Sequence, residues 1–229
     1  ATVSADLKGT DLINAVADKE SVIELYKQFG TSAVTALASL NWRTVGFVGT
    51  NNGTKLTAED SAKIARFVTL CDAYSIPVVT FVDSEGFEKS SAAELAGSIR
   101  DSAKLAQAYA SATTAKIAVV TGKAYGSAYV ALASTAAGSD FTFAWENAVI
   151  APTTPEAAVV FLNGVSEDNA KQAQEYAENE ADAFTAAANG YVDRVITADD
   201  TKSALTSAIE AASSKRVVAP AKKHVNFVY

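Results

Sequence analysis

One stretch near the middle of the chain, from Ile117 to Leu132, constrains the fold more than any other. It begins with the apolar, β-branched run from Ile117 to Val120, passes through a predicted turn at residues 121–123, and continues into small residues that open a buried helix. The pattern is typical of a strand, a tight turn and a helix N-terminus. The rest of the chain is therefore expected to supply neighbouring strands and the helices that cover them.

The predicted helix is preceded and opened by three small residues, Gly126, Ser127 and Ala128. Backbone N–H groups at a helix N-terminus have no partner within the helix, and the positive end of the helix dipole lies behind them. Such groups can stabilise a developing oxyanion, and small residues let a substrate carbonyl come close. The stretch thus predicts a site for an enolate-like oxygen. The alternative interpretation is that these residues only allow close helix packing.

Composition favours a single large α/β domain, because the chain has 229 residues of which 49% are hydrophobic. The net charge of −7 argues against nucleic acid or an anionic membrane as a partner, since either requires a basic face. No apolar run approaches the roughly 20 residues of a membrane span, so we expect no membrane insertion. The single cysteine, Cys71, allows no internal disulfide, which fits a soluble protein of the reducing cytoplasm.

Strand and helix patterns alternate along the chain, which predicts a largely parallel sheet with right-handed crossovers after one antiparallel hairpin. Thr57 with Asp60, and Ser91 with Glu94, resemble capping boxes at helix starts, and Asp11 is expected to cap the first helix. The strands are expected at 22–26, 34–40, 44–48, 78–82, 117–120, 141–144, 148–151 and 192–196. The helices are expected within the lead-in 1–20 and at 58–74, 91–111, 155–162, 166–182 and 201–213, with a further piece ending at Asn189-Gly190 and an extended tail over 214–229.

Side chains that carry common catalytic chemistry are scarce. The one histidine, His224, lies in the tail, so a serine or cysteine triad and a zinc site lack their usual members. No base is signalled near Cys71, which is expected to be a buried structural thiol. Dinucleotide-binding and P-loop motifs are absent from the sequence. No metal is expected, and the remaining option is catalysis by backbone donors and positioning.

A series of short motifs, in register over roughly residues 20–229, resembles the carboxyltransferase component of biotin-dependent acyl-CoA carboxylases and decarboxylases. More narrowly, it resembles the C-terminal half of the propionyl-CoA carboxylase β subunit type. The motifs are Ala65-Arg66-Phe67-Val68 to Cys71-Asp72, Ile76 to Asp83 with Gly86-Phe87, Gly97 with Ile99-Arg100, Ala103 to Leu105, Lys123 to Tyr129, Gly190 to Asp193 with Val195-Ile196, and Pro220 to His224 with Asn226.

The resemblance implies a crotonase-like α/β fold of the ββα spiral type, forming one C-terminal carboxyltransferase domain over residues 1–229. The family moves a carboxyl group between carboxybiotin and an acyl-CoA of the propionyl, acetyl or methylmalonyl type, through two oxyanion holes. This half is expected to hold the biotin ureido oxygen on the N–H groups of Ser127 and Ala128, with Gly126 permitting approach. The remaining residues expected to shape the biotin pocket are Asp83, Gly86, Phe87, Tyr125, Tyr129 and Val130.

The resemblance also implies partners. Biotin is expected on a separate carrier protein, and the acyl-CoA site on an N-terminal carboxyltransferase half that meets this one across a subunit interface in an oligomer. Decarboxylated biotin can then act as the base, which would explain the missing acid and base side chains. The chain by itself is accordingly expected to have little transferase activity.

Three departures from the family pattern leave alternatives open. Ser127 stands where many relatives have glycine, Val130 where an aspartate is frequent, and the loop after Ile150 differs. The alternatives are the α-subunit type domain of a biotin-dependent acyl-CoA decarboxylase, a non-catalytic crotonase-like scaffold, and a CoA hydrolase or isomerase. The last would need an acid or base such as Glu85 or Glu146.

Overall fold

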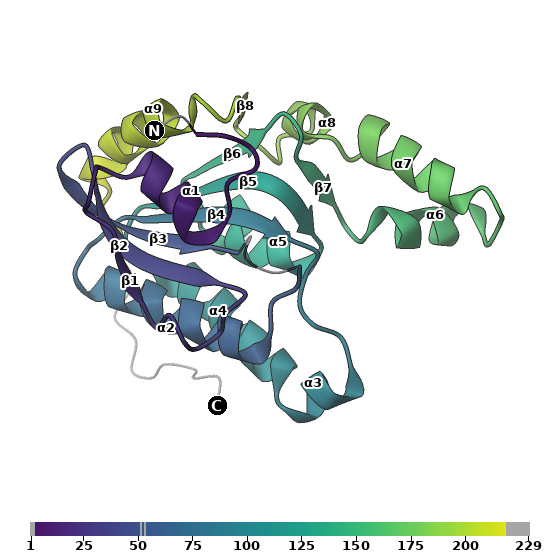
Figure 1. The fold of residues 1–229 in the computed structure, drawn as a ribbon, viewed down its shortest axis with the longest axis horizontal. Coiled ribbons are helices and arrows are strands. Elements are labelled where there is room, and N and C mark those ends of the chain that lie inside the picture. The colour runs from purple at the N-terminus through teal and green to yellow at the C-terminus, as the bar shows by residue number, and fades with distance from the viewer. Residues whose placement is uncertain (1–2, 51, 53, 219–229) are drawn as a thin grey trace.

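The computed structural model describes residues 3–50, 52 and 54–218, which form a mixed sheet covered by helices on both faces (Figure 1). The strands are β1 (Ile23–Leu25), β2 (Val34–Leu40), β3 (Arg43–Gly49), β4 (Val78–Ser84), β5 (Lys116–Tyr125), β6 (Phe141–Trp145), β7 (Val149–Ala151) and β8 (Arg194–Ile196). The helices are α1 (Gly9–Val16), α2 (Ala58–Ala73), α3 (Ser91–Leu95), α4 (Ser98–Ser111), α5 (Ser127–Leu132), α6 (Pro155–Asn163), α7 (Asn169–Asn179), α8 (Ala183–Ala188) and α9 (Thr201–Ala211).

The sheet has the strand order β1-β2-β3-β4-β5-β6-β8, and the short β7 pairs with the far end of β5. The first three strands are antiparallel, with Leu40 opposite Arg43 at the tight β2–β3 turn. From β3 onward all neighbours are parallel. The expected hairpin and parallel sheet are therefore confirmed, and every parallel strand points its carboxyl end toward the same edge.

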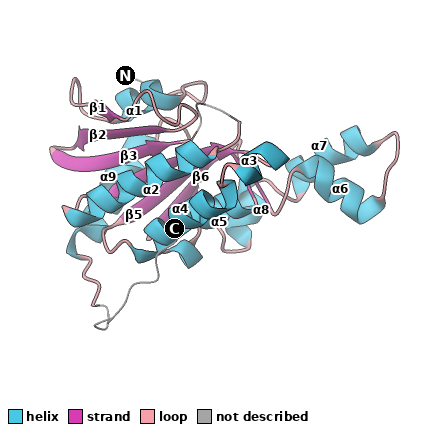
Figure 2. Ribbon diagram, turned by 90° about the horizontal axis from the view of Figure 1, so that it is seen from below, coloured by secondary structure: helices cyan, strands magenta, loops and turns pink. Residues whose placement is uncertain are grey.

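Alternate residues of the central strands face two separate apolar cores. Val79 and Phe81 of β4 belong to the core beneath α1 and α9, whereas Val78 and Val82 belong to the core beneath α2, α4 and α5. Figure 2 shows the second group of helices lying across the strands. Because both faces are covered, the central strands are apolar on both sides rather than alternating.

Helix α2 is fixed at its start by Asp60, which is fully buried. Its Oδ2 accepts hydrogen bonds from the N–H of Thr57 (2.8 Å) and the hydroxyl of Thr57 (2.7 Å), and its Oδ1 accepts from the N–H of Ala33 (3.0 Å). This is the expected capping box with an added tie to the chain before β2. Further along, a Cβ on Gly46 of β3 would lie 2.5 Å from the Cys71 sulfur, so glycine is what lets α2 pack this closely.

Several element boundaries differ from those expected. There is no turn at 121–123, because β5 continues to Tyr125 and pairs there with β7. The single helix expected at 91–111 is two helices, capped by Ser90 and interrupted at Gly97, whose φ is +95°. The helix expected from Ser166 begins at Asn169 and ends at Asn179.

The N-terminal segment is more than a lead-in. Leu12, Ile13 and Val16 of α1 are completely buried in the core under the sheet's first face. Asp11 lies in the first turn of α1 and does not cap it, since the N-cap position is Lys8. The tail from 214 is described only to Val218, and the motif from Pro220 to Asn226 lies outside the described residues.

Helices α6 and α7 pack against each other and project from the body as a helical arm (Figures 1 and 2). The arm leaves the sheet after β7 and returns to it through α8. Within the described part of the chain, no helix is both long and apolar enough to cross a lipid bilayer.

We expect Asp60→Ala to lower the free energy of unfolding by about 2 kcal/mol, because it removes a helix cap and leaves the buried N–H of Ala33 unpaired. Urea unfolding followed by circular dichroism would measure the loss. The matched control is Asp11→Ala, an exposed carboxylate in the first turn of α1, which should change stability by less than about 0.5 kcal/mol. Equal effects of the two substitutions would refute this role for Asp60.

Candidate functional site

The carboxyl ends of β4 and β5 lie side by side, which brings together residues far apart in the sequence. The two strands pair in parallel from Val78 opposite Lys116 to Val82 opposite Val120, and then lose register before Ser84 pairs with Ala124. Residues 121–123 of β5 therefore bulge opposite Asp83. In parallel sheets this edge is where ligand sites collect.

Asp83 fills the bulge. Its Oδ1 accepts a hydrogen bond from the backbone N–H of Lys123 (2.8 Å), and its own N–H donates to the hydroxyl of Thr50 (3.0 Å). A Cβ on Gly122 would stand 2.5 Å from Oδ1, so only glycine lets the carboxylate lie against the strand. Asp83 is thus engaged in holding β5 in place.

The loop after β4 is fastened to the segment before α2. The hydroxyl of Ser84 donates to the carbonyl of Gly86 (3.1 Å), and the same carbonyl accepts from the N–H of Leu56 (2.9 Å). Leu56 and Phe87 form a parallel bridge. Gly86 has φ +114°, and a Cβ there would be in ordinary contact, at 3.8 Å, with the Tyr125 carbonyl oxygen of β5. The loop carrying Gly86 and Phe87 therefore lies beside the end of β5.

Gly126 forms the corner between β5 and α5. Its φ of +55° and ψ of −129° correspond to the first central position of a type II′ turn, which glycine dominates. A Cβ here would lie 3.0 Å from the carbonyl oxygen of Pro152. The N–H of Gly126 donates to the carbonyl of Ala151 (2.9 Å), so β7 holds the corner and this N–H is not free for a ligand.

Ser127 is the exposed residue at the start of α5, whereas Ala128 is fully buried. Helix geometry leaves the first N–H groups without an intrahelical partner, and among the described residues no acceptor is bonded to the N–H of Ser127. The structure therefore offers, on an exposed residue of this corner, a backbone donor with no acceptor among the described residues. Because Ala128 is fully buried in this chain alone, its N–H is covered.

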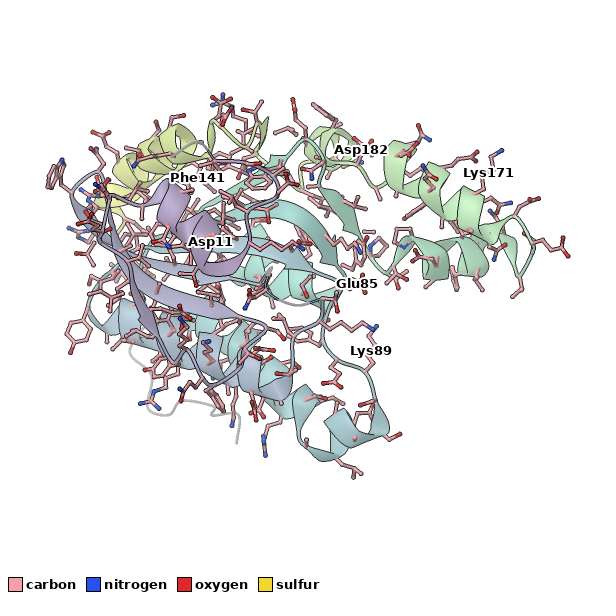
Figure 3. The ribbon with its side chains drawn as sticks, viewed as in Figure 1. Asp11, Glu85, Lys89, Phe141, Lys171 and Asp182 are labelled. Atoms are coloured by element: carbon pink, nitrogen blue, oxygen red, sulfur yellow. The ribbon has the colours of Figure 1, made fainter. Side chains whose placement is uncertain are left out.

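Lys123 and Tyr125 lie two residues apart on the same face of β5, just before the corner. The Lys123 ammonium pairs with Glu85 (2.7 Å) while remaining half exposed, and the hydrogen bond to Glu85 raises the pKa of Lys123. The Tyr125 ring is buried, and burial raises its pKa, so the phenol remains protonated at neutral pH. Figure 3 shows Glu85 at the edge of the body below the base of the arm.

The predicted site residues are only partly gathered. Asp83, Gly86, Tyr125 and Gly126 lie at one corner through the contacts above. Tyr129 points elsewhere, because its hydroxyl donates to the carbonyl of Tyr191 (2.6 Å). Val130 is an exposed residue of α5, and Phe87 is half-buried against the core beneath α2.

Three features of this corner were not predicted from the sequence. They are the contact of Gly122 with Asp83, the ion pair of Lys123 with Glu85, and the contact of Pro152 with Gly126. The sequence did carry a signal for two of these residues, because Gly122 is a glycine within a strand pattern and Pro152 directly follows β7. A glycine in a strand signals a bulge or close backbone approach, which is the role that Gly122 has here.

The other catalytic groups suggested by the sequence form no site among the described residues. Cys71 is fully buried, and burial raises the pKa of its thiol to about 12. The described residues contain no group of three His, Cys, Asp or Glu able to hold a metal, and His224 lies outside them. A cavity of about 900 Å³, lined by Arg43, Tyr74 and Lys215 among others, lies at the amino ends of β3, β4 and β5, opposite the corner.

The comparisons with known proteins agree on one family. The sequence profile described as the carboxyl transferase domain matches residues 6–227. The chain is 40% identical over 219 residues to the mitochondrial propionyl-CoA carboxylase beta chain of Rattus norvegicus, covering 94% of this chain and 40% of that protein. It is 37% identical over 228 residues to the methylmalonyl-CoA carboxyltransferase 12S subunit of Propionibacterium freudenreichii subsp. shermanii, covering 95% of this chain and 44% of that protein.

Among solved structures, the transcarboxylase 12S hexamer with bound methylmalonyl-coenzyme A superposes with a TM-score of 0.91 at 35% identity, covering 100% of this chain and 46% of that one. The expected crotonase-like α/β fold is thereby confirmed. The chain spans about two fifths of the length of the curated relatives it matches.

We expect Gly126→Ala to cost about 2 kcal/mol of stability, because alanine is strained in this backbone conformation and its Cβ meets the Pro152 carbonyl. Urea unfolding would measure the loss. The matched control is Gly190→Ala, which also has positive φ (+77°) but open space around it, and should cost about 1 kcal/mol. A smaller loss at Gly126 than at Gly190 would contradict the geometry of the corner.

We expect Cys71 to react with a disulfide reagent such as DTNB at pH 8 at least about 100-fold more slowly in the folded protein than in urea, since the buried thiol stays protonated. Its raised pKa gives stability that is complete below about pH 8.5 and falls as the pH rises toward 12, where the unfolded thiol ionises but the folded one does not. Equal reaction rates in the two states would show that the thiol is accessible.

Proposed function

This chain belongs to the carboxyl transferase domain family, and from that premise we propose that it is the C-terminal, carboxybiotin-binding half of a biotin-dependent acyl-CoA carboxyltransferase. The proposal assigns one domain to residues 1–229. The acyl-CoA site, of the propionyl or methylmalonyl-CoA type, belongs to a second half outside residues 1–229. The extent of the matches supports this division, because the chain corresponds to only about two fifths of each relative.

The observation that carries the proposal is the corner between β5 and α5. It presents the N–H of Ser127, an exposed residue, without an acceptor among the described residues, next to a glycine that no other residue can replace without strain. A preorganised N–H donor costs no reorganisation when negative charge develops on a bound oxygen. We assign the ureido oxygen of biotin to this donor.

Ala128 is the second donor in the proposal. Because it is fully buried in the chain alone, its N–H reaches the ligand only when the side chains covering it move aside on binding. Such tightening on complex formation is common for catalytic hydrogen bonds. Bound carboxybiotin supplies the carboxyl group that is transferred, and the residues of this chain hold and orient its ring.

The surrounding residues fit this role. Gly86 and Phe87 lie beside the end of β5 on a loop that is hydrogen-bonded to Leu56, so one wall of the pocket is rigid. We assign Asp83 to fixing the bulge rather than to the ligand, since its Oδ1 accepts the hydrogen bond from the backbone N–H of Lys123. Tyr125 presents a protonated hydroxyl for which no partner is found among the described residues. Tyr129 is not assigned to the pocket, since its hydroxyl is bonded to the Tyr191 carbonyl, and the exposed Val130 is assigned to the outer part of the pocket.

A hydrolase or isomerase is less well supported. Such enzymes need an acid or base beside the substrate, and the two carboxylates that the sequence offers are poorly suited. Glu85 is neutralised by Lys123 at 2.7 Å, and Glu146 is exposed on the turn after β6. We accordingly propose that biotin, carried on a separate carrier protein in the cytoplasm, is the group that this corner binds.

We expect Ser127→Trp to weaken binding of a biotinylated carrier domain, because the indole would cover the backbone N–H that we assign to the ureido oxygen. Surface plasmon resonance with immobilised carrier would measure a loss of at least about 10-fold in affinity, or about 1.4 kcal/mol. The matched control is Ser203→Trp on α9, exposed and remote from the corner, which should bind as the unchanged chain does.

Unchanged binding by a folded Ser127→Trp variant would refute the site. Failure of the unchanged chain itself to bind the carrier would instead favour a non-catalytic scaffold. Circular dichroism of each variant separates loss of binding from loss of fold.

A further inference from the structure

The cavity of about 900 Å³ at the amino ends of β3, β4 and β5 lies at the end of the sheet away from the arm (Figure 1). Its walls are the start of β3, the connection from α2 to β4, the connection from α4 to β5, and residues 209–217 at and after the end of α9. We call it the amino-end cleft. Small-molecule sites in proteins measure roughly 300–1,000 Å³, so its size suits such a ligand. It lies at the opposite end of the strands from the corner, so its ligand is separate from the one proposed there.

The lining of the amino-end cleft is cationic, in a chain whose net charge is −7. The described residues that line it include Arg43, Lys215 and Arg216 and no aspartate or glutamate. Arg43 donates to the carbonyl of Ile209 (3.4 Å) and Arg216 to the carbonyl of Lys215 (2.7 Å). No carboxylate in the described part of the chain lies within ion-pair distance of either arginine. Both exposed guanidinium groups therefore keep most of their N–H donors for a ligand.

Lys215 has a structural role in the cleft. Its ammonium donates to the carboxylate of Asp140 (2.8 Å) and to the carbonyl of Thr114 (3.0 Å). These bonds tie the segment after α9 to the start of β5. The wall that carries Arg216 is therefore fastened to the sheet, and the charge of Lys215 is already paired.

The groups beside the cleft that would repel an anion are engaged within the chain. The Oδ1 atom of Asp72 accepts hydrogen bonds from the N–H groups of Thr113 (2.7 Å) and Thr114 (2.8 Å). The last carbonyls of α4 form the negative end of that helix, and the buried ammonium of Lys116 donates to one of them, at Ala112 (2.7 Å). An anion in the cleft is thus left with the two arginines as its dominant charges.

Ser75 keeps a hydroxyl at a position that glycine usually occupies. The N–H of Ser75 donates to the carbonyl of Asp72 (3.0 Å), and the N–H of Ile76 donates to the carbonyl of Cys71 (2.8 Å). This is the Schellman motif at a helix end, whose left-handed residue is most often glycine, and Ser75 adopts it with φ +56°. Strained residues of this kind collect at binding sites. The hydroxyls of Ser75, Thr44 and Ser213, all in the lining, have no partner among the described residues.

Tyr74 gives the cleft a flat apolar wall. Its side chain lines the cavity and is 72% exposed, which is unusual for a ring of this size. Aromatic rings at exposed positions beside cationic side chains serve as platforms on which nucleobases stack. The cleft therefore combines two donors for phosphate with one platform for a planar ring.

We propose that the amino-end cleft binds a nucleotide. The phosphates lie against Arg43 and Arg216, whose planar guanidinium groups can each bond two phosphate oxygens at once. The base stacks on Tyr74, and the hydroxyls of Thr44 and Ser75 contact the remaining oxygen atoms. All of these contacts come from side chains, so the site needs no P-loop. Free nucleotides and the nucleotide part of coenzyme A share this chemistry.

Isothermal titration calorimetry of the full chain with ADP tests the proposal, with pyrophosphate as a probe for the phosphate contacts alone. ADP should bind at least about 10-fold more tightly than pyrophosphate, because only ADP has a base to stack. Arg43→Gln combined with Arg216→Gln should weaken ADP binding at least about 10-fold. Tyr74→Ala should weaken the binding of ADP about 10-fold more than that of pyrophosphate, which a purely structural role of the ring would not produce.

The matched control combines Lys55→Gln with Lys171→Gln, which removes two positive charges from exposed positions outside the cleft. It should bind ADP as the unchanged chain does, and circular dichroism should show that every variant is folded. The proposal is overturned if the unchanged chain does not bind ADP, or if the control loses as much affinity as the arginine variant. It is also overturned if pyrophosphate binds as tightly as ADP, since the cleft would then hold anions by charge alone.

A parallel titration with coenzyme A distinguishes the two sources of the nucleotide. Tighter binding of ADP than of coenzyme A supports a site for a free nucleotide. Tighter binding of coenzyme A, with the same dependence on Tyr74 and the two arginines, supports a site for the nucleotide part of the coenzyme.

Discussion

The contact between the Asp83 carboxylate and the backbone of β5 is the constraint on which the candidate site depends. It lies opposite the bulge of residues 121–123, where Gly122 leaves room for it, and its hydrogen bond from the Lys123 N–H fixes the last residues of the strand. Because β5 is held there, it extends far enough to pair with β7. That pairing in turn holds Gly126 against the Pro152 carbonyl and sets the direction in which α5 begins.

Much of the architecture follows from local patterns. The hairpin, the capping box at Thr57 and the apolar strands β4 and β6 could be predicted because each has a strong short-range signal: a turn, a cap, or an uninterrupted apolar run. The end of β5 could not be predicted, since the residues after Val120 have the sequence pattern of a turn. Only their pairing with β7 keeps them extended. Tertiary contacts overrode local propensity there. At Gly97 the break is local, because the glycine adopts a left-handed conformation (φ +95°) and divides one expected helix into two.

The candidate site was predictable in its central residues and less so in its surroundings. Gly126 and Ser127 were found from their small size beside a strand, and the structure places them at an exposed corner. The sequence could not reveal that Tyr129 would bond to the Tyr191 carbonyl, 62 residues away. Nor could it show that Ala128 would be covered, because burial depends on long-range packing. Backbone donors leave no side-chain signature, so only geometry distinguishes an oxyanion site from close packing.

The arm has a consequence for how the molecule moves. Its two helices pack chiefly on each other, and they join the body through β7, α8 and the packing of Tyr176 of α7 against the small cluster of Tyr125, Ala151 and Ala181. A unit with few contacts to the body can open and close without disturbing the central strands, at a fraction of the free energy of global unfolding. Yet β7 also ends at Ala151, whose carbonyl holds the corner at Gly126. A contact that fixes the position of the arm therefore also fixes the corner at Gly126, so the arm and the candidate site are linked mechanically through β7.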